Sequence, residues 1–292
     1  MKTNDQHILN NYDLICPACK SCLELDCDSE GLTCMNDICK KVYPLINNIP
    51  SILIDGFEMK KGEGFYEKIL GGTMEDGTTD AFVRYDASIR VHILKKFLKS
   101  ESMDGDVLDL CCSKAPFYSY LSQIGYTSKV YGVDLLLHQL EIAKSRGVKA
   151  VHANALKIPF LNEKFSTVIF SEALVHLMLK KDQKSVFEEI FRVMKPNGTL
   201  LITVSNFRAI ALQSYINDSN MLKSEHCTFF TRQDILSLIK DKFEIINIRP
   251  FAFYYLLPNL LRRSFWALKM FDFIMRIVPS LAMVDFIKLK KI

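Results

Sequence analysis

Acidic side chains lie within or directly after two consecutive apolar runs in the middle of the chain. Asp109 is part of Val107 to Leu110, and Asp134 follows the run from Lys129 to Val133. The first run is apolar on both faces, which is typical of a parallel strand buried between helices. An acid at the end of the second strand can accept hydrogen bonds from both hydroxyls of a ribose. A carboxylate at the position of Asp109 suits an ammonium group, so the two acids predict a site for a charged nucleoside.

The turn between these runs is made of small residues and contains no glycine. It runs from Cys111 to Ala115, and Pro116 then stands where a helix can begin without losing a hydrogen bond. A dinucleotide site needs glycines that let backbone amides close on a pyrophosphate. S-adenosylmethionine has no phosphate, so its turn needs only small residues. The turn therefore favours S-adenosylmethionine over a dinucleotide.

The stretch VLDLCCSKAPF resembles the first motif of the class I S-adenosylmethionine-dependent methyltransferases, of the methyltransferase-11 type. The resemblance places Cys111, Ser113 and Ala115 at the positions of three alternating glycines in that motif. A residue with a Cβ atom resists positive φ. The alternative interpretation is therefore a non-catalytic binding module with a degenerate cofactor loop.

Further motifs of the same family follow in order, and the resemblance covers about residues 80 to 250. Asn154 to Phe160 resembles the third motif, whose acid meets the adenine amino group, and the carbonyl oxygen of Asn154 can accept the same hydrogen bond. Ser171 to Leu177 resembles the segment that borders cofactor and substrate. The cofactor-binding residues that we predict are Asp109, Cys111, Ser113, Ala115, Asp134, Leu135, Asn154, Ala155, Ser171, Glu172 and Tyr85, with Arg90 as a weaker candidate.

Two histidines are candidates for a general base. His226 lies on a loop where related small-molecule methyltransferases bring groups toward the substrate, and it is the preferred candidate. His176 follows the strand predicted at 165–170. The competing interpretations are a loop histidine without a function for His226 and a histidine that holds a helix in place for His176.

Four cysteines near the N-terminus have the spacing of a metal site. Cys16 and Cys19 form one short pair, and Cys34 and Cys39 form a second. Two such pairs can hold one tetrahedral zinc ion, which would supply much of the folding energy of so small a segment. The stretch resembles the zinc ribbons fused ahead of many methyltransferases. Cys22 and Cys27 are spare thiols, and the alternative is a ribbon held by packing without metal.

The charge of the ribbon region argues against nucleic acid as a partner. Residues 1–60 contain five lysines, no arginine and nine carboxylates. An acidic module follows a phosphate backbone poorly. An RNA methyltransferase guided by the ribbon is therefore the alternative function rather than the leading one.

The C-terminal residues 251–292 are apolar and basic. Arg262, Lys269 and Arg276 recur at sevenfold spacing between aromatic and aliphatic residues. This pattern is typical of a helix that lies in a membrane interface, and the charges interrupt every run long enough to span one. The alternative is an extra helical layer packed on the core.

Together these observations predict an α/β protein with a Rossmann-like, mostly parallel sheet and helices on both faces. We expect a zinc ribbon at 1–55, a linker at 56–80, an S-adenosylmethionine-binding methyltransferase domain at 81–250 and a helical extension at 251–292. The predicted function is methyl transfer to a small-molecule or lipid-like acceptor. The N-terminus shows no export signal, so we expect a cytoplasmic protein that contacts a membrane through residues 251–292.

Overall fold

The computed structural model describes residues 12–26, 31–53, 81–98, 105–126, 128–174, 177, 180–205, 232–251 and 257–292. The strands are β1 (Leu23–Asp26), β2 (Gly31–Cys34), β3 (Val42–Ile46), β4 (Ile49–Ile52), β5 (Val107–Leu110), β6 (Val130–Asp134), β7 (Lys149–Ala153), β8 (Phe165–Phe170), β9 (Met194–Ser205), β10 (Phe243–Phe251) and β11 (Val284–Lys291). The helices are α3 (Ala81–Leu98), α4 (Pro116–Gln123), α5 (Leu137–Ser145), α6 (Lys180–Val193), α8 (Arg232–Ile239), α9 (Asn259–Arg262) and α10 (Phe265–Met275), with 3-10 turns η1 (Ala155–Lys157) and η5 (Pro279–Leu281).

The middle of the sheet is parallel, as predicted. Its strands lie in the order β7-β6-β5-β8-β9, and each neighbouring pair runs parallel. The chain moves outward from β5 to β6 and β7, and then returns to the other side of β5 with β8. The order therefore reverses between β5 and β8, which is where open α/β sheets bind ligands.

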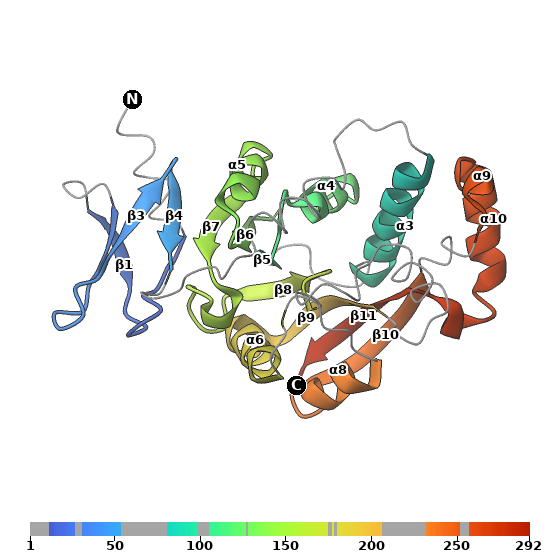
Figure 1. Ribbon diagram of the computed structural model, residues 1–292. Helices are drawn as coiled ribbons and strands as arrows, with labels where there is room; N and C mark the ends of the chain where they lie inside the picture. The colour runs from blue at the N-terminus through green and yellow to red at the C-terminus, as the bar shows by residue number, and fades with distance from the viewer. Residues whose placement is uncertain are drawn as a thin grey trace.

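Helices cover both faces of this sheet (Figure 1), and an apolar cluster fills each side. Residues of α3, α4, α5 and α10 belong to one cluster, whereas residues of α6 and α8 belong to the other. The helix α4 begins at Pro116 as predicted, and Gly125, just beyond its end, has a φ of 82°. This left-handed conformation suits glycine and stops the helix.

The N-terminal ribbon is continuous with the central sheet. Strands β1 to β4 form antiparallel neighbours, and β4 then pairs in parallel with β7 through Ser51 and His152. Ribbon residues such as Tyr12 and Leu32 belong to the same apolar cluster as Val151 on β7. The ribbon is thus an extension of the parallel sheet, with a shared core.

The C-terminal segment differs from the predicted helical extension. Helices α9 and α10 do form, but the chain then returns as β11, which lies between β9 and β10 and runs antiparallel to both. The basic residues Lys288 and Lys291 are buried because their ammonium groups donate to backbone carbonyls, that of Phe97 for Lys288 and those of Phe191 and Met194 for Lys291. The predicted basic extension is therefore in part a core strand.

Candidate functional site

The carboxyl edge of the parallel strands gathers most of the residues predicted to bind a cofactor. Asp109 lies near the end of β5 and Asp134 ends β6. Asn154 directly follows β7, and Ser171 and Glu172 directly follow β8. Because parallel strands end at the same edge, residues distant in sequence come together there.

Asp109 is buried with an unsatisfied carboxylate oxygen. The residue is 2% exposed, and its Oδ2 atom has no hydrogen-bond partner among the described residues. Burial raises the pKa of Asp109 well above its ordinary value, and the nearby charge of Asp134 raises it further. A buried carboxyl without a partner is costly when ionised, so this position favours a cationic ligand group that would pair with it.

The turn after β5 adopts a glycine-like backbone without glycine. The φ angles are 58° at Cys111, 51° at Ser113 and 52° at Ala115. We expected a Cβ atom to resist this conformation, and the structure places all three residues in it nonetheless. Each left-handed residue costs about 1–2 kcal/mol relative to its right-handed form, so the surrounding contacts must hold the turn.

Those contacts come from inside the protein. The Ala115 side chain is fully buried, and Cys111 packs against the apolar core. The Ser113 hydroxyl donates to Oε1 of Gln139 on α5 over 3.3 Å. Contacts of all three side chains with the rest of the protein therefore help to hold the left-handed turn.

Asp134 is fixed by backbone amides. Its Oδ2 accepts from the Ser113 amide at 2.8 Å, and its Oδ1 accepts from the Leu136 amide at 2.9 Å. Burial raises the pKa of Asp134, and these hydrogen bonds oppose that shift. Leu135, the next predicted residue, offers its carbonyl to the His152 ring at 3.0 Å. Each oxygen of Asp134 keeps a lone pair for a further donor.

Asn154 caps the 3-10 turn η1. Its Oδ1 accepts from the Leu156 amide at 2.9 Å, and Ala155 is buried as the first residue of the turn. A carbonyl oxygen has two lone pairs, so one remains for a ligand amino group. The capping role holds the side chain at the edge of the sheet.

The segment after β8 is held by Thr203 and Arg90. The Thr203 hydroxyl lies 3.0 Å from the Ser171 hydroxyl and accepts from the Glu172 amide at 2.7 Å. Glu172 has a left-handed φ of 61°, and its carboxylate pairs with Arg90 at 3.0 Å. Arg90 in turn pairs with Asp86 on the same helix at 2.6 Å.

Tyr85 contacts residues of α10. Its ring meets Phe265 edge-on, with ring centroids 5.8 Å apart, and its hydroxyl is hydrogen-bonded to Asp272 of α10. Burial and the Asp272 carboxylate raise the pKa of Tyr85. Tyr85 is 3% exposed, which is more buried than the half-buried aromatic of the competing interpretation, and its role at the cofactor stays a prediction. His176 and His226, the two candidate bases, lie outside the described residues.

Sequence reasoning missed the groups that hold the site in place. Thr203 sits within the apolar run of β9, and Gln139 lies one turn into α5, where nothing in the local pattern marks it. Arg192 of α6 donates to the carbonyls of Ile158 and Phe160, both at 2.7 Å. Only the folded arrangement brings these residues to the site.

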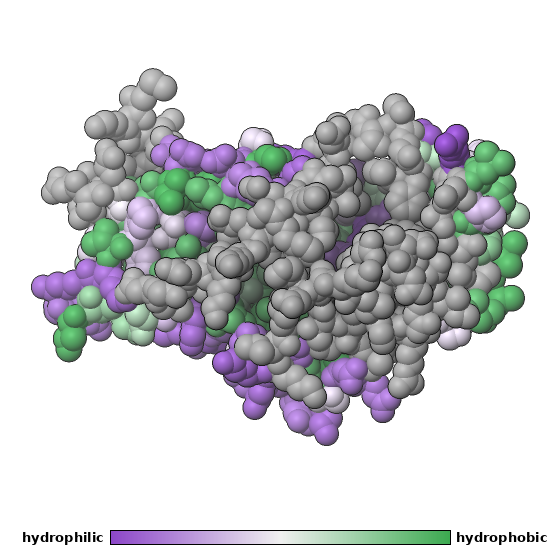
Figure 2. Space-filling view, viewed as in Figure 1, coloured by the Kyte–Doolittle hydropathy of each residue, from purple (hydrophilic) through white to green (hydrophobic). Residues whose placement is uncertain are grey.

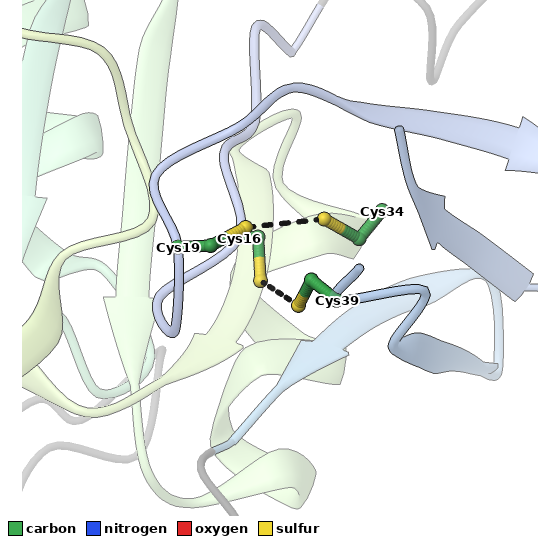
Figure 3. A group of neighbouring side chains, drawn as sticks. All are labelled: Cys16, Cys19, Cys34 and Cys39. Atoms are coloured by element: carbon green, nitrogen blue, oxygen red, sulfur yellow. Dashed lines mark hydrogen bonds between the residues drawn. The ribbon is translucent and has the colours of Figure 1, made fainter. Parts of the chain in front are cut away.

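The four predicted metal ligands converge (Figure 3). The Sγ atoms of Cys16, Cys19, Cys34 and Cys39 all lie within 4.8 Å of one another, and the Cys16–Cys39 distance is 3.8 Å. A tetrahedral zinc ion with Zn–S bonds of about 2.3 Å separates its ligands by about 3.8 Å. Hydrogen bonds from Ser21 lower the pKa of Cys19 to about 6. The cysteines thus fit a structural zinc ion.

The ribbon also contacts the loop that follows Asn154. The Ile15 amide donates to the Pro159 carbonyl at 3.0 Å. Lys20 directly follows Cys19, and its Nζ atom lies 3.7 Å from Oε2 of Glu189. The same carboxylate oxygen accepts a hydrogen bond from the Ile158 amide at 2.8 Å. The four-cysteine group and the carboxyl edge of the parallel strands are therefore linked through one loop.

Comparisons with known proteins agree on one domain type. Residues 108–202 match the family described as "Methyltransferase domain". The chain is 30% identical over 102 residues to a demethylmenaquinone methyltransferase of Geobacillus sp. (strain WCH70), covering 32% of this chain and 42% of that relative. It is 27% identical over 111 residues to "Probable tRNA methyltransferase 9B" of Homo sapiens, covering 38% and 24%. The chain thus aligns with less than half the length of these relatives.

A solved structure extends the likeness beyond the matched segment. The PH0226 protein of Pyrococcus horikoshii OT3 superposes with a TM-score of 0.55, covering 78% of this chain and 99% of that one. The two are 18% identical, so the superposition is a likeness of fold alone.

Proposed function

We propose that the chain is a class I S-adenosylmethionine-dependent methyltransferase that transfers the methyl group of this cofactor to a small-molecule or lipid-like acceptor. The observation that carries the proposal is the buried Asp109 carboxyl, whose Oδ2 atom lacks a partner among the described residues. Asp109 lies beside the turn from Cys111 to Ala115, in which three residues have the positive φ angles that glycine usually adopts. The ammonium of a bound cofactor would satisfy this oxygen.

Three residues share the recognition of the cofactor. Asp109 would hold the amino-acid end, Asp134 the ribose hydroxyls and Asn154 the adenine amino group. The latter two side chains are fixed by backbone amides and keep a lone pair for the ligand. Cys111, Ser113, Ala115, Leu135, Ala155, Ser171 and Glu172 would line the same edge.

S-adenosylmethionine supplies an electrophilic methyl group on a sulfonium when it is bound. The residues at the carboxyl edge of the sheet would hold the cofactor so that its methyl group could pass in line to the acceptor, with the electron pair of the broken carbon–sulfur bond left on the sulfur. The protein's contribution is chiefly positioning, and a hydroxyl acceptor also needs a base. We propose His226, or else His176, for that base, with the acceptor's proton moving to a ring nitrogen.

We propose that the four cysteines bind a structural zinc ion. The four sulfurs would fill all four coordination positions of the ion. No position would then be open to water or substrate, as in structural zinc sites. Its ligands would hold the ribbon loops that brace the cofactor edge through Ile15 and Lys20.

The acceptor class can be tested directly. The purified protein is incubated with cofactor labelled in its methyl group and with cell extract separated into lipid, small-molecule and RNA fractions. We expect label in the lipid or small-molecule fraction, and much less of it with the Asp109→Asn variant at the same cofactor concentration. Label confined to RNA would favour the alternative of an RNA methyltransferase, which one named relative makes worth testing. Cofactor binding without any transfer would favour a non-catalytic module.

A further inference from the structure

A row of large apolar side chains is exposed on α9, α10 and the turn after them. Its members are Leu260, Trp266, Met270, Phe273, Ile274 and Ile277. Phe273 is 67% exposed and Ile277 is 81% exposed, although both are residues that normally avoid water. From Trp266 to Ile277 the members are spaced three or four residues apart, or adjacent, which places them along one side of the helix. Figure 2 shows apolar residues gathered at the edge where Figure 1 places these helices.

Positive charge borders this apolar face. Arg263, Lys269 and Arg276 are exposed, and the Lys269 ammonium lies 5.3 Å from the centroid of the Trp266 ring. Asp272 is the only acid between residues 257 and 283, and it is buried. The solvent-facing side of α10 is therefore apolar and cationic.

The opposite side of α10 is fixed to the body of the protein. Leu268 is fully buried, and α10 packs on α3. The Asp272 carboxylate accepts from Arg276 at 3.1 Å and is hydrogen-bonded to the Tyr85 hydroxyl. These contacts hold the apolar face outward rather than letting it turn into the core.

We propose that this face docks on an anionic membrane surface, with α10 lying in the plane of the interface. Apolar side chains of such helices enter the boundary between headgroups and acyl chains, while basic side chains meet the lipid phosphates. None of the described helices is long and apolar enough to cross a membrane. A second copy of the chain fits the face less well, because docking two copies would bring like charges together.

The single tryptophan of the chain makes the docking measurable. Trp266 is 70% exposed on the proposed face, so its fluorescence reports on that face alone. With vesicles containing about a third phosphatidylglycerol, we expect a blue shift, quenching by lipids brominated in the acyl chains, and weakening by salt. Vesicles of phosphatidylcholine alone should bind more weakly. The measurement needs neither cofactor nor acceptor, so it can fail or succeed independently of the proposed methyl transfer.

Matched variants locate the contact. Phe273→Ser and Ile277→Ser should each weaken vesicle binding about tenfold or more, since each removes an exposed apolar side chain that would be buried in the lipid on docking. Lys269→Gln should weaken it about fivefold, as expected for one basic residue near anionic lipid. Leu161→Ser, at an exposed leucine outside the face, serves as the control and should bind like the unchanged protein. The absence of a shift with anionic vesicles, or an equal loss in the control, would overturn the proposal. A blue shift that grows with protein concentration without lipid would indicate self-association instead.

Discussion

At the scale of single residues, the glycine-free turn is the feature that departs most from expectation. Ala115 has a φ of 52° and is fully buried, whereas Ala143 is equally buried within the helix α5. Both would lose one methyl group on substitution by glycine. In a helix the change costs about 1 kcal/mol, whereas at Ala115 it also relieves a left-handed strain of about 1–2 kcal/mol.

We therefore predict that Ala115→Gly is less destabilising than Ala143→Gly by at least about 1 kcal/mol in the free energy of unfolding. Chemical denaturation of the two variants measures the difference. Equal losses at the two positions would mean that the turn is not strained as its φ angles indicate.

Asp109 gives a prediction with opposite signs for stability and function. Burial raises its pKa in the folded state above the value of about 4 expected in the unfolded chain. The folded state therefore binds more protons between these two values, and stability falls as pH rises through the folded pKa. Below the unfolded value this penalty is absent.

Asp109→Asn should therefore be more stable than the unchanged protein at neutral and alkaline pH in the absence of cofactor. The advantage should shrink as the pH falls toward 4. Unfolding curves across this pH range, with Asp106→Asn at the opposite end of β5 as control, measure the effect. A variant that is less stable than the unchanged protein at neutral pH would show that Asp109 has a partner in the free protein.

At the scale of elements, the sequence predicts the strands and turns whose signals are local. Val107 to Leu110 and Phe165 to Phe170 form strands with the predicted bounds. Each is an apolar run bounded by turn residues, so it can be recognised without knowing which distant residues it contacts. The strand β11 could not be predicted from local sequence in this way. Its Lys288 is buried, and the ammonium group donates to the Phe97 carbonyl, 191 residues away in sequence. The capping role of Asn154 likewise depends on the folded turn.

The contacts between the ribbon and the loop after Asn154 predict an effect of metal removal on cofactor binding. Chelation of zinc, or Cys34→Ser, should lower cofactor affinity severalfold, because Ile15 and Lys20 brace the loop around Ile158. Zinc content by elemental analysis and cofactor affinity by calorimetry are measured on the same sample.

Cys22→Ser is the matched control, since Cys22 is exposed and lies outside the group of four. It should retain both zinc and affinity. If metal-free protein binds the cofactor as tightly as the zinc-loaded protein, the ribbon does not support the loop.

At the scale of the whole molecule, one sheet joins the ribbon strands β1 to β4 to the central parallel strands. Because β4 pairs with β7 and both sides share an apolar cluster, we predict a single cooperative unfolding transition. Removing the metal should shift this transition to lower temperature as a whole. Two separate transitions in calorimetric scans, of which only one responds to chelator, would show that the ribbon folds as an independent unit.

The sheet also separates the two ends of the molecule. The ribbon strands begin the sheet order and β11 and β10 end it, with the cofactor edge of β5, β6 and β8 between them. In Figure 1 the ribbon and the helices α9 and α10 lie at opposite ends. A membrane bound by α10 would therefore leave the four-cysteine group at the far end of the protein.

The most direct test of the cofactor site is a calorimetric titration of S-adenosylmethionine into the unchanged protein, Asp109→Asn and Asp106→Asn. We predict binding by the unchanged protein and by Asp106→Asn, and an affinity lower by about tenfold or more for Asp109→Asn, since a charge-assisted hydrogen bond is lost. No heat of binding at millimolar cofactor, or an unchanged affinity in Asp109→Asn, would contradict the site as described.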